Sequence, residues 1–371
     1  MQPDIQSLSP LARRAVDPGT PLQLRLMAAK GALPGVTPAE IILVLAVLSQ
    51  SSETDLAGTA KQTLSVLPSA LLTGALSSDL PPAAIDALVP YYGKAPQVVT
   101  QLLRMRTLSA ETLVSLAQQA NEQVAEIIAT NETLLLKNPE AIEKLYMNKA
   151  TRMSTADRLI DLAVRNKIEL SIPAFHLAAE ALLGEVTAEP TVAKGYDEIF
   201  AETERLAQEV EASLGEDGDT HERNEEGEEK VKDVAVPLYA RISQMSITQK
   251  IRRATLGTSA ERLLLVRDTN RLVAVAAASS PMLNENDAAR IASSRNVIED
   301  VLRIICRNPE FTRSYQVKLN LVVNPRTPFT FSSRMLPLLR DNDLRLIGKS
   351  KQVPGAIGLA ARNHMLRKQG K

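Results

Sequence analysis

The chain is built from short segments rich in leucine and alanine, and polar residues that can start a helix precede most of them. Two of these starts share the pattern Asp/Asn-Pro-x-Thr-Pro, at residues 17–21 and 324–328. Proline after Asp or Asn fixes φ for a turn. The next Thr-Pro predicts a helix whose N-cap is the threonine and whose first residue is the proline, Thr20–Pro21 and Thr327–Pro328.

Further helix starts of the capping type recur along the chain. In each, a Ser, Thr or Asn precedes an acidic or amide residue by three positions, which lets the two satisfy each other's backbone N–H groups. The pairs are Thr37 with Glu40, Ser154 with Asp157, Ser246 with Gln249, and Asn284 with Asp287. Segments 145–166 and 275–296 also align without gaps, with a cap at the same offset, and each segment ends in Arg-Asn.

These starts lie at irregular intervals of roughly 20 to 45 residues, the length of a helical hairpin in a repeat protein. The sequence therefore predicts an all-α fold, a degenerate α-solenoid of helical hairpins that bury their apolar stripes against their neighbours. The alternative is an ordinary helical domain whose helices begin with ordinary caps. The aligned segments favour the solenoid because they share more than their caps.

Composition agrees with packed helices. The 371 residues are 44% hydrophobic but only 3% aromatic, with no Trp, so the core is made mainly of Leu, Ala, Val and Ile. The longest apolar run, 41–48, is far shorter than the roughly 20 residues that span a bilayer. A single cysteine, Cys306, cannot form an internal disulfide, and the first residues show no signal peptide. These features predict a cytoplasmic protein in which Cys306 is an inert core residue.

An acidic segment divides the chain. Residues 196–214 carry apolar side chains at helical spacing and predict an acidic amphipathic helix that caps the preceding helices or docks onto a partner. Residues 215–233 have no large apolar residue before Val231 and predict a disordered linker. The expected organisation is an N-terminal helical array over 1–183, the acidic helix and linker over 184–235, and a basic C-terminal helical array over 236–371.

Charge separates the two arrays. Residues 241–371 hold 23 Lys/Arg against 9 Asp/Glu, whereas residues 1–240 hold 20 against 34. The basic part could bind nucleic acid through phosphates, bind an acidic protein surface, or be masked by the acidic segment of its own chain. A further alternative is that its arginines only coat solvated helix faces.

Two groups of residues are candidates for partner binding. Basic residues cluster at the C-terminal end, and a polar connection between two predicted helices lies at 146–152, where binding residues of repeat proteins often gather. The first group is Lys349, Lys351, Arg362, Arg367 and Lys368, and the second is Tyr146, Asn148, Lys149 and Arg152. For the second group, the alternative is that Asn148 merely ends one helix before the next begins.

Catalytic motifs are lacking in the sequence. The three histidines, His176, His221 and His364, lie in different segments, and no metal-ligand spacing accompanies them. The tetrapeptide IGKS at 347–350 lacks the first glycine of a phosphate-binding loop, because Asp343 occupies that position. We therefore expect no enzyme activity, no metal and no cofactor.

Two stretches of sequence carry a resemblance to a known kind of protein. The segment LLLKNPEAIEKLYMNKATRMSTADRLIDLAVRN within 128–166 resembles bacterial helical-repeat proteins of the myxobacterial and related deltaproteobacterial type. The C-terminal NPRTP and LLRDNDLRLIGKSKQVPGAIGLAAR resemble the HEAT-like repeats of the same proteins. The resemblance implies an α-helical repeat fold with a scaffolding role. The predicted function is a protein–protein interaction scaffold; the alternative is duplex binding by the basic array.

Overall fold

The computed structural model describes residues 8–185, 196–214, 218–223, 228–350 and 352–369. Within them the chain is all-α, with helices α1–α25 and one short β-hairpin. The chain divides into two compact units, Met1–Leu170 and Ser171–Lys371. The predicted all-α class is confirmed.

The N-terminal unit contains the first twelve helices. Their bounds are α1 Pro10–Val16, α2 Leu22–Ala29, α3 Pro38–Leu48, α4 Thr54–Ser65, α5 Ser69–Leu76, α6 Pro82–Tyr92, α7 Pro96–Leu102, α8 Ala110–Gln119, α9 Glu122–Ala129, α10 Glu132–Lys137, α11 Pro139–Met147 and α12 Met153–Arg165.

The C-terminal unit contains the remaining helices and both strands. Their bounds are α13 Phe175–Glu185, α14 Tyr196–Ser213, β1 His221–Arg223, β2 Glu229–Val231, α15 Val236–Ser243, α16 Ile247–Leu256, α17 Ser259–Leu265, α18 Arg271–Ala278, α19 Glu285–Ser293, α20 Glu299–Arg307, α21 Pro309–Arg313, α22 Tyr315–Val323, α23 Phe329–Met335, α24 Asp341–Lys349 and α25 Gly355–Gln369. Short 3-10 turns lie at Asp233–Ala235 and Leu336–Leu338.

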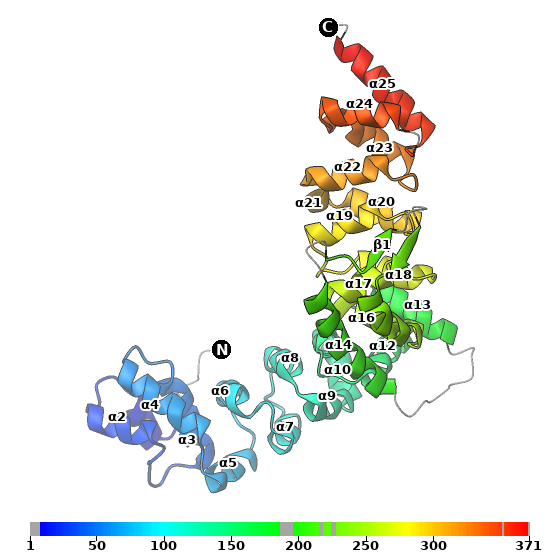
Figure 1. Ribbon diagram of the computed structural model, residues 1–371. Coiled ribbons are helices and arrows are strands. Elements are labelled where there is room, and N and C mark those ends of the chain that lie inside the picture. The colour runs from blue at the N-terminus through cyan, green and yellow to red at the C-terminus, as the bar shows by residue number, and fades with distance from the viewer. Residues whose placement is uncertain (1–7, 186–195, 215–217, 224–227, 351, 370–371) are drawn as a thin grey trace. The chain divides into compact units, whose positions relative to one another are not determined.

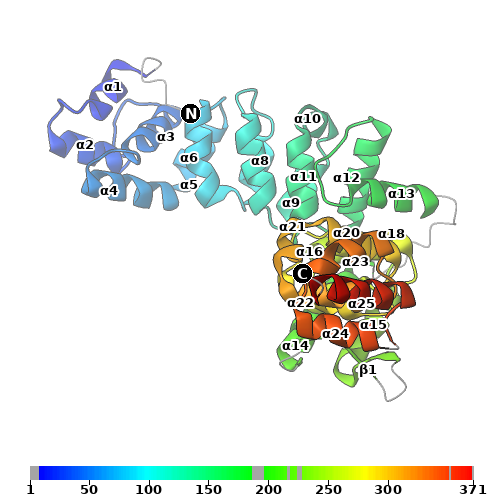
Figure 2. The ribbon, with the colours of Figure 1, turned by 90° about the horizontal axis from the view of Figure 1, so that it is seen from above.

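Helix α3 is the centre of the first half of the N-terminal unit. It carries the apolar run 41–48, of which only Val47 is not fully buried. A helix that is apolar on every side must be surrounded, and α3 packs against α1, α2, α4, α5 and α6. Beyond it, α6, α8 and α11 lie side by side, each in contact with the next (Figure 2).

In the C-terminal unit the helices succeed one another from α16 to the end of the chain (Figure 1). Contacts link α16 with α18, α18 with α20, α19 with α22, α22 with α23, and α24 with α25. Each helix therefore buries its apolar side mainly against helices close to it in sequence. The described part of the unit forms one continuous core of Leu, Ile, Val and Ala side chains.

At two positions an asparagine side chain joins a turn to the helix packed beside it by hydrogen bonds. Asn324 ends α22, and its side-chain amide donates to the carbonyls of Ala292 and Ser294, at 2.7 Å each, at the end of α19. Its side-chain oxygen accepts the N–H of Arg326 at 3.0 Å, and its carbonyl accepts the N–H of Thr327 at 3.1 Å. The side chain thus closes its own turn and satisfies two carbonyls that the end of α19 leaves open.

Asn148 makes the same set of bonds at the end of α11. Its amide donates to the carbonyls of Ala117 and Ala120, at 3.1 and 2.8 Å, where α8 ends. Its side-chain oxygen accepts the N–H of Ala150, and its carbonyl accepts the N–H of Thr151. The pairs α8–α11 and α19–α22 are therefore joined in the same way.

Most predicted helix starts agree with the structure. Capping boxes are present at Thr37 and Ser246, and Asn284 caps α19. An additional capping box that the sequence analysis did not identify lies at Thr258 and Glu261. The prediction for Ser154 is wrong, because α12 begins at Met153 after Arg152 and leaves Ser154 inside its first turn.

At the two Thr-Pro motifs the helix begins one residue later than predicted. Pro21 and Pro328 are the N-cap residues, with extended ψ values of 134° and 133°, and neither helix has a side-chain cap bond. The turn before α23 is held by Asn324 instead, and Thr327 is buried beneath it.

The acidic helix lies in the C-terminal unit and not, as expected, at the end of the N-terminal array. Helix α14 has nearly the predicted bounds, but it packs against α15 and α17. Its buried face presents Phe200, Thr203, Ala207 and Val210. The division between the units therefore follows Leu170, well before the predicted boundary at 183.

Part of the predicted disordered linker is an ordered hairpin. Strands β1 and β2 pair antiparallel, with His221 opposite Val231 and Arg223 opposite Glu229. The composition argument failed here because polar contacts replace apolar burial. Asp219 and Glu229 lie 3.4 Å from the buried guanidinium of Arg267. Residues 215–217 and 224–227 of the predicted linker lie outside the described residues.

Candidate functional site

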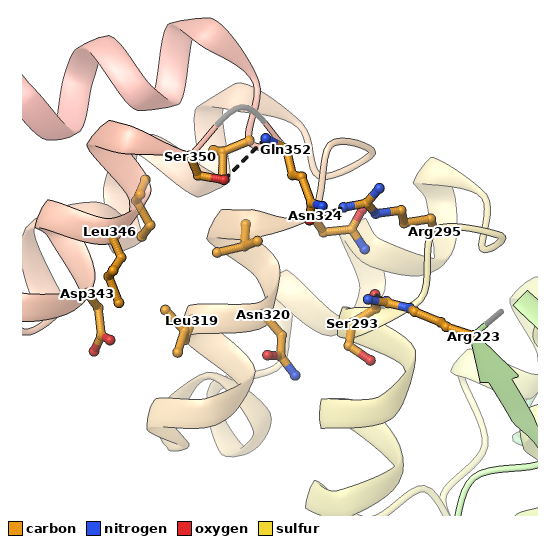
Figure 3. Close-up of a pocket in the computed structure, with 13 residues that line it drawn as sticks. Arg223, Ser293, Arg295, Leu319, Asn320, Asn324, Asp343, Leu346, Ser350 and Gln352 are labelled. Carbon is orange, nitrogen blue, oxygen red and sulfur yellow. Dashed lines mark hydrogen bonds between the residues drawn. The ribbon is translucent and has the colours of Figure 1, made fainter. Parts of the chain in front are cut away.

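A groove of about 370 Å³ crosses three helices of the C-terminal unit. It runs over α19, α22 and α24 and is bounded at one side by the hairpin (Figure 3). Because its lining residues come from all three helices, the groove runs across them rather than along any one of them. Its lining residues are Arg223, Ser293, Arg295, Leu319, Asn320, Val323, Asn324, Asp343, Leu346, Ile347, Ser350, Gln352 and Val353.

The groove has an apolar floor and a polar rim. Leu319 on α22 and Leu346 on α24 face it from one side, and Leu346 is 67% exposed (Figure 3). Arg295 and Arg223 reach toward it from the opposite side. An apolar surface bordered by a few directed polar groups is the usual composition of a ligand-binding cleft.

Arg295 contributes a positive charge without a carboxylate at ion-pair distance among the residues described. Its guanidinium donates to the side-chain oxygen of Gln352 at 3.3 Å. The backbone N–H of Gln352 donates to the hydroxyl of Ser350, and this bond fixes the position of Gln352. A neutral amide partner leaves the charge of Arg295 uncompensated, so the rim attracts anions.

Arg223, on strand β1, adds a second guanidinium to this rim. It donates to the carbonyl of Ser293 at 2.5 Å and lies 3.7 Å from the carboxylate of Glu229. Its side chain remains 48% exposed. The hairpin therefore brings a cation from residue 223 beside one from residue 295.

Glu229 is a buried carboxylate at the edge of the groove, bound by hydrogen bonds from neighbouring residues. One oxygen accepts the Ser294 hydroxyl at 2.5 Å, and the other accepts the N–H of Arg295 at 2.7 Å. Burial by itself would raise the pKa of Glu229, but these bonds and the charges of Arg267 and Arg223 outweigh it and lower the pKa below its usual value. Carboxylate binding is thus already present at the edge of the groove.

His221 lies in the same hairpin and is held neutral. Burial and the nearby positive charge of Arg267 lower its pKa to about 4, although Asp219 and Glu229 act in the opposite direction. Its Nδ1 is 2.9 Å from the Thr220 hydroxyl. A neutral imidazole in this position stabilises the docked hairpin rather than serving the groove.

A separate buried ionic cluster lies beneath α14. Arg253 donates to Glu261 at 2.6 Å, and both side chains are almost fully buried. Arg252 and Arg253 also stack on the ring of Phe200, at 5.3 and 4.6 Å from its centroid. Burial raises the pKa of Glu261, and the adjacent Arg253 opposes that rise. The cluster fixes α14, α16 and α17 together.

Two of the four predicted binding residues of the 146–152 connection have structural roles. Tyr146 is buried at 2% exposure, and Asn148 forms the turn described above. Arg152 is exposed and forms an ion pair with Glu122, whereas Lys149 is exposed. The structure thus places Tyr146 and Asn148 in the packing of α11.

Four of the predicted C-terminal basic residues lie in the described part of the chain, where they are exposed but only partly available. Lys368 pairs with Asp341 at 2.8 Å, and Arg362 donates to the carbonyl of Gly348 at 2.7 Å. Lys349 and Arg367 are exposed, and Lys349 directly precedes Ser350 at the groove. Lys351 lies outside the described residues.

Sequence reasoning missed Arg223, Arg295 and Gln352. The Arg-Asn pair at 295–296 stood out only as the end of an aligned segment. No local pattern indicates that residue 223 lies beside 295, because the contact depends on the hairpin. The high arginine content of the C-terminal part was the only available signal.

Comparisons with known proteins give no match to any family model, curated protein or solved structure. Over the residues described, no cluster of His, Cys, Asp and Glu side chains could hold a metal ion. No helix in the same part of the chain is both long and apolar enough to cross a membrane.

Proposed function

We propose that this chain is a non-enzymatic interaction scaffold, an α-solenoid of degenerate HEAT-like repeats. Two observations support the repeat interpretation. Helices contact mainly those close to them in sequence, as in proteins whose repeats stack on their neighbours. The asparagine turns at 148 and 324 join two helix pairs through the same bonds.

The C-terminal unit would bind an acidic segment of a protein partner. The observation that carries this proposal is the distribution of charge along the unit. Acidic side chains of 202–229 pair with Arg241, Arg253 and Arg267. In the described part of 301–371, Arg303 pairs with Glu299 and Lys368 with Asp341, yet the stretch contains 14 Lys/Arg against 3 Asp/Glu. Such an excess attracts anionic surfaces and speeds association.

Duplex nucleic acid is the second candidate, and the same arginine-rich stretch favours it. Phosphate contacts need basic side chains and little else. The low aromatic content gives few surfaces on which bases could stack, so single strands would be poor ligands. The two candidates predict different ligand preferences at equal charge.

A salt series tests the proposal on the full chain. Labelled poly-L-glutamate and a labelled 20-base-pair duplex are titrated with protein at several salt concentrations. We expect poly-L-glutamate to bind and its affinity to fall as salt rises. Tighter binding of the duplex at equal salt would make nucleic acid the ligand, and no binding of either at low salt would refute both candidates.

A charge-matched pair of variants locates the binding to the C-terminal unit. Each variant replaces three exposed cations by glutamine, one set in each unit. The test variant changes Arg313, Arg334 and Arg345, and the control variant changes Lys94, Arg104 and Arg106. The test variant should bind poly-L-glutamate several-fold more weakly, whereas the control should match the parent chain.

A further inference from the structure

We infer that the groove across α19, α22 and α24 binds an extended acidic segment of a partner protein, with one carboxylate held between Arg295 and Arg223. An adjacent apolar side chain of that segment would lie on Leu319 and Leu346. This inference rests on the proposed scaffold function and names the surface and the ligand chemistry.

The first argument is that the two arginines are already arranged for an anion. Arg295 bonds only a neutral amide, at 3.3 Å from Gln352. Arg223 contacts Glu229 at 3.7 Å, longer than a direct hydrogen bond, so its charge is only partly compensated. A guanidinium binds a carboxylate through two parallel N–H donors, and two guanidinium groups can share one carboxylate.

The second argument is that the chain fills the neighbouring position with its own carboxylate. Glu229 takes the Ser294 hydroxyl, the N–H of Arg295 and the charge of Arg267. The outward guanidinium of Arg295 takes no part in that arrangement. The groove's own carboxylate, Asp343, lies on the opposite side with Leu346 and accepts the Tyr315 hydroxyl (Figure 3), so a carboxylate of the partner would be the one to bind the guanidinium of Arg295.

The third argument separates a peptide from a nucleic acid. Val323, Leu346 and Val353 give the groove an apolar floor that a phosphate backbone cannot use. A cavity of about 370 Å³ lies within the range of about 300 to 1,000 Å³ that is typical of ligand clefts. An acidic residue beside a leucine or valine matches both the charge of the rim and the floor.

The experiment compares two labelled dodecapeptides by fluorescence anisotropy with the full chain. One carries two Glu–Leu pairs in a Gly/Ser background, and its twin carries Gln in place of Glu. We expect the Glu peptide to bind at least about tenfold more tightly than its twin, as for charge-assisted hydrogen bonds.

Matched variants assign the binding to the groove. Arg295→Ala should weaken the Glu peptide about tenfold, whereas Arg307→Ala, which removes an equal charge from an exposed residue of α20 outside the groove, should not. On the floor, Leu346→Ala should weaken binding, and Leu338→Ala, at a similar exposure of 62%, should leave it unchanged. Circular dichroism confirms that each variant remains folded.

Three results would overturn the inference. Equal weakening by Arg295→Ala and Arg307→Ala would show that only net charge matters. Equal binding of the Glu and Gln peptides would exclude a carboxylate ligand, and tighter binding of a duplex DNA that Arg295→Ala abolishes would make the groove a phosphate site. If poly-L-glutamate still binds in either of the first two cases, the scaffold proposal survives and only the groove assignment fails, whereas the third case makes nucleic acid the ligand.

Discussion

At the residue scale, single polar side chains determine how helices join. Asn324 is buried at 4% exposure and satisfies two carbonyls of α19 together with one N–H of its own turn. An alanine there would leave the carbonyls without partners in a closed environment, which costs more than the bonds themselves contribute. The Asn-Pro pair at 324–325 indicated a turn, but not this connection.

We expect Asn324→Ala to lower the free energy of unfolding of the C-terminal unit by about 2 to 4 kcal/mol, because two buried carbonyls lose their donors. Urea unfolding followed by circular dichroism measures the change. Asn342→Ala, at an exposed position of α24, should stay within about 0.5 kcal/mol of the parent chain. Equal effects of the two variants would contradict the anchoring role.

Cys306 gives a second prediction at this scale. Burial raises the pKa of its thiol to about 12, so it is protonated at neutral pH and poorly nucleophilic. Ellman's reagent should therefore react slowly with the native chain at pH 8 and rapidly once the chain is unfolded in guanidinium chloride. Rapid reaction of the native chain would show that the thiol is accessible.

At the scale of elements, α16 of the C-terminal unit buries charged side chains, whereas α3 of the N-terminal unit buries apolar ones. Helix α3 is central because nearly all its side chains are apolar, whereas α16 buries Arg252 and Arg253. Both arginines stack on the Phe200 ring of α14, and Arg253 also pairs with the carboxylate of Glu261. The amphipathic pattern of 196–214 predicted a helix, yet it could not identify α16 and α17 as its neighbours.

Removing one partner of the buried pair should be more harmful than removing both. We expect Arg253→Ala to destabilise the unit by about 3 to 5 kcal/mol, since Glu261 would be left buried without its cationic partner. The double variant Arg253→Met with Glu261→Leu should recover much of that loss. Thermal unfolding of the single and double variants compares them, and a double variant as unstable as the single one would contradict this reasoning.

Docking of the hairpin should weaken in acid. His221 has a pKa of about 4 when docked and an ordinary value of 6.5 when released, so its contribution to docking is complete above pH 6.5 and falls between 6.5 and 4. The pKa of Glu229 is also lowered on docking, so its contribution is present above 4.5 and is lost at lower pH.

Hydrogen exchange measures this effect at the Lys232 N–H, which donates to the carbonyl of Thr220 at 2.9 Å. After correction for intrinsic rates, protection should decrease from pH 7 to pH 4.5. In His221→Asn, which does not titrate in that range, protection should change little over the same interval. An unchanged pH dependence in the variant would exclude His221 as its cause.

At the scale of the whole molecule, the point where the basic excess begins does not coincide with the boundary between the two compact units. The basic excess begins near residue 241, but the C-terminal compact unit begins at Ser171. Residues 171–371 hold 28 Lys/Arg against 27 Asp/Glu, so the unit is almost neutral once its acidic helix and hairpin are counted. The acidic segment is part of this fold and pairs with its arginines.

A fragment test follows from this division. Residues 171–371 expressed alone should be helical, monodisperse and cooperative in thermal unfolding. Residues 236–371 should fail in these respects, because they lack α13 and α14 and expose the core beneath them, including Leu263 and Ile251. Size-exclusion chromatography and circular dichroism compare the fragments, and a cooperative 236–371 fragment would support the sequence-based boundary.

The sequence by itself determined the all-α class, the helix starts at Thr37, Ser246 and Asn284, and the existence of the acidic helix. These depend on apolar spacing and on bonds within a few residues. The tertiary structure decided where the units divide, that Asp219 and Glu229 fold back on Arg267, and that Arg223 and Arg295 border one groove. Those features depend on polar contacts between residues up to 70 positions apart, such as the hydrogen bond from Arg223 to the carbonyl of Ser293, and local pattern carries no record of such contacts.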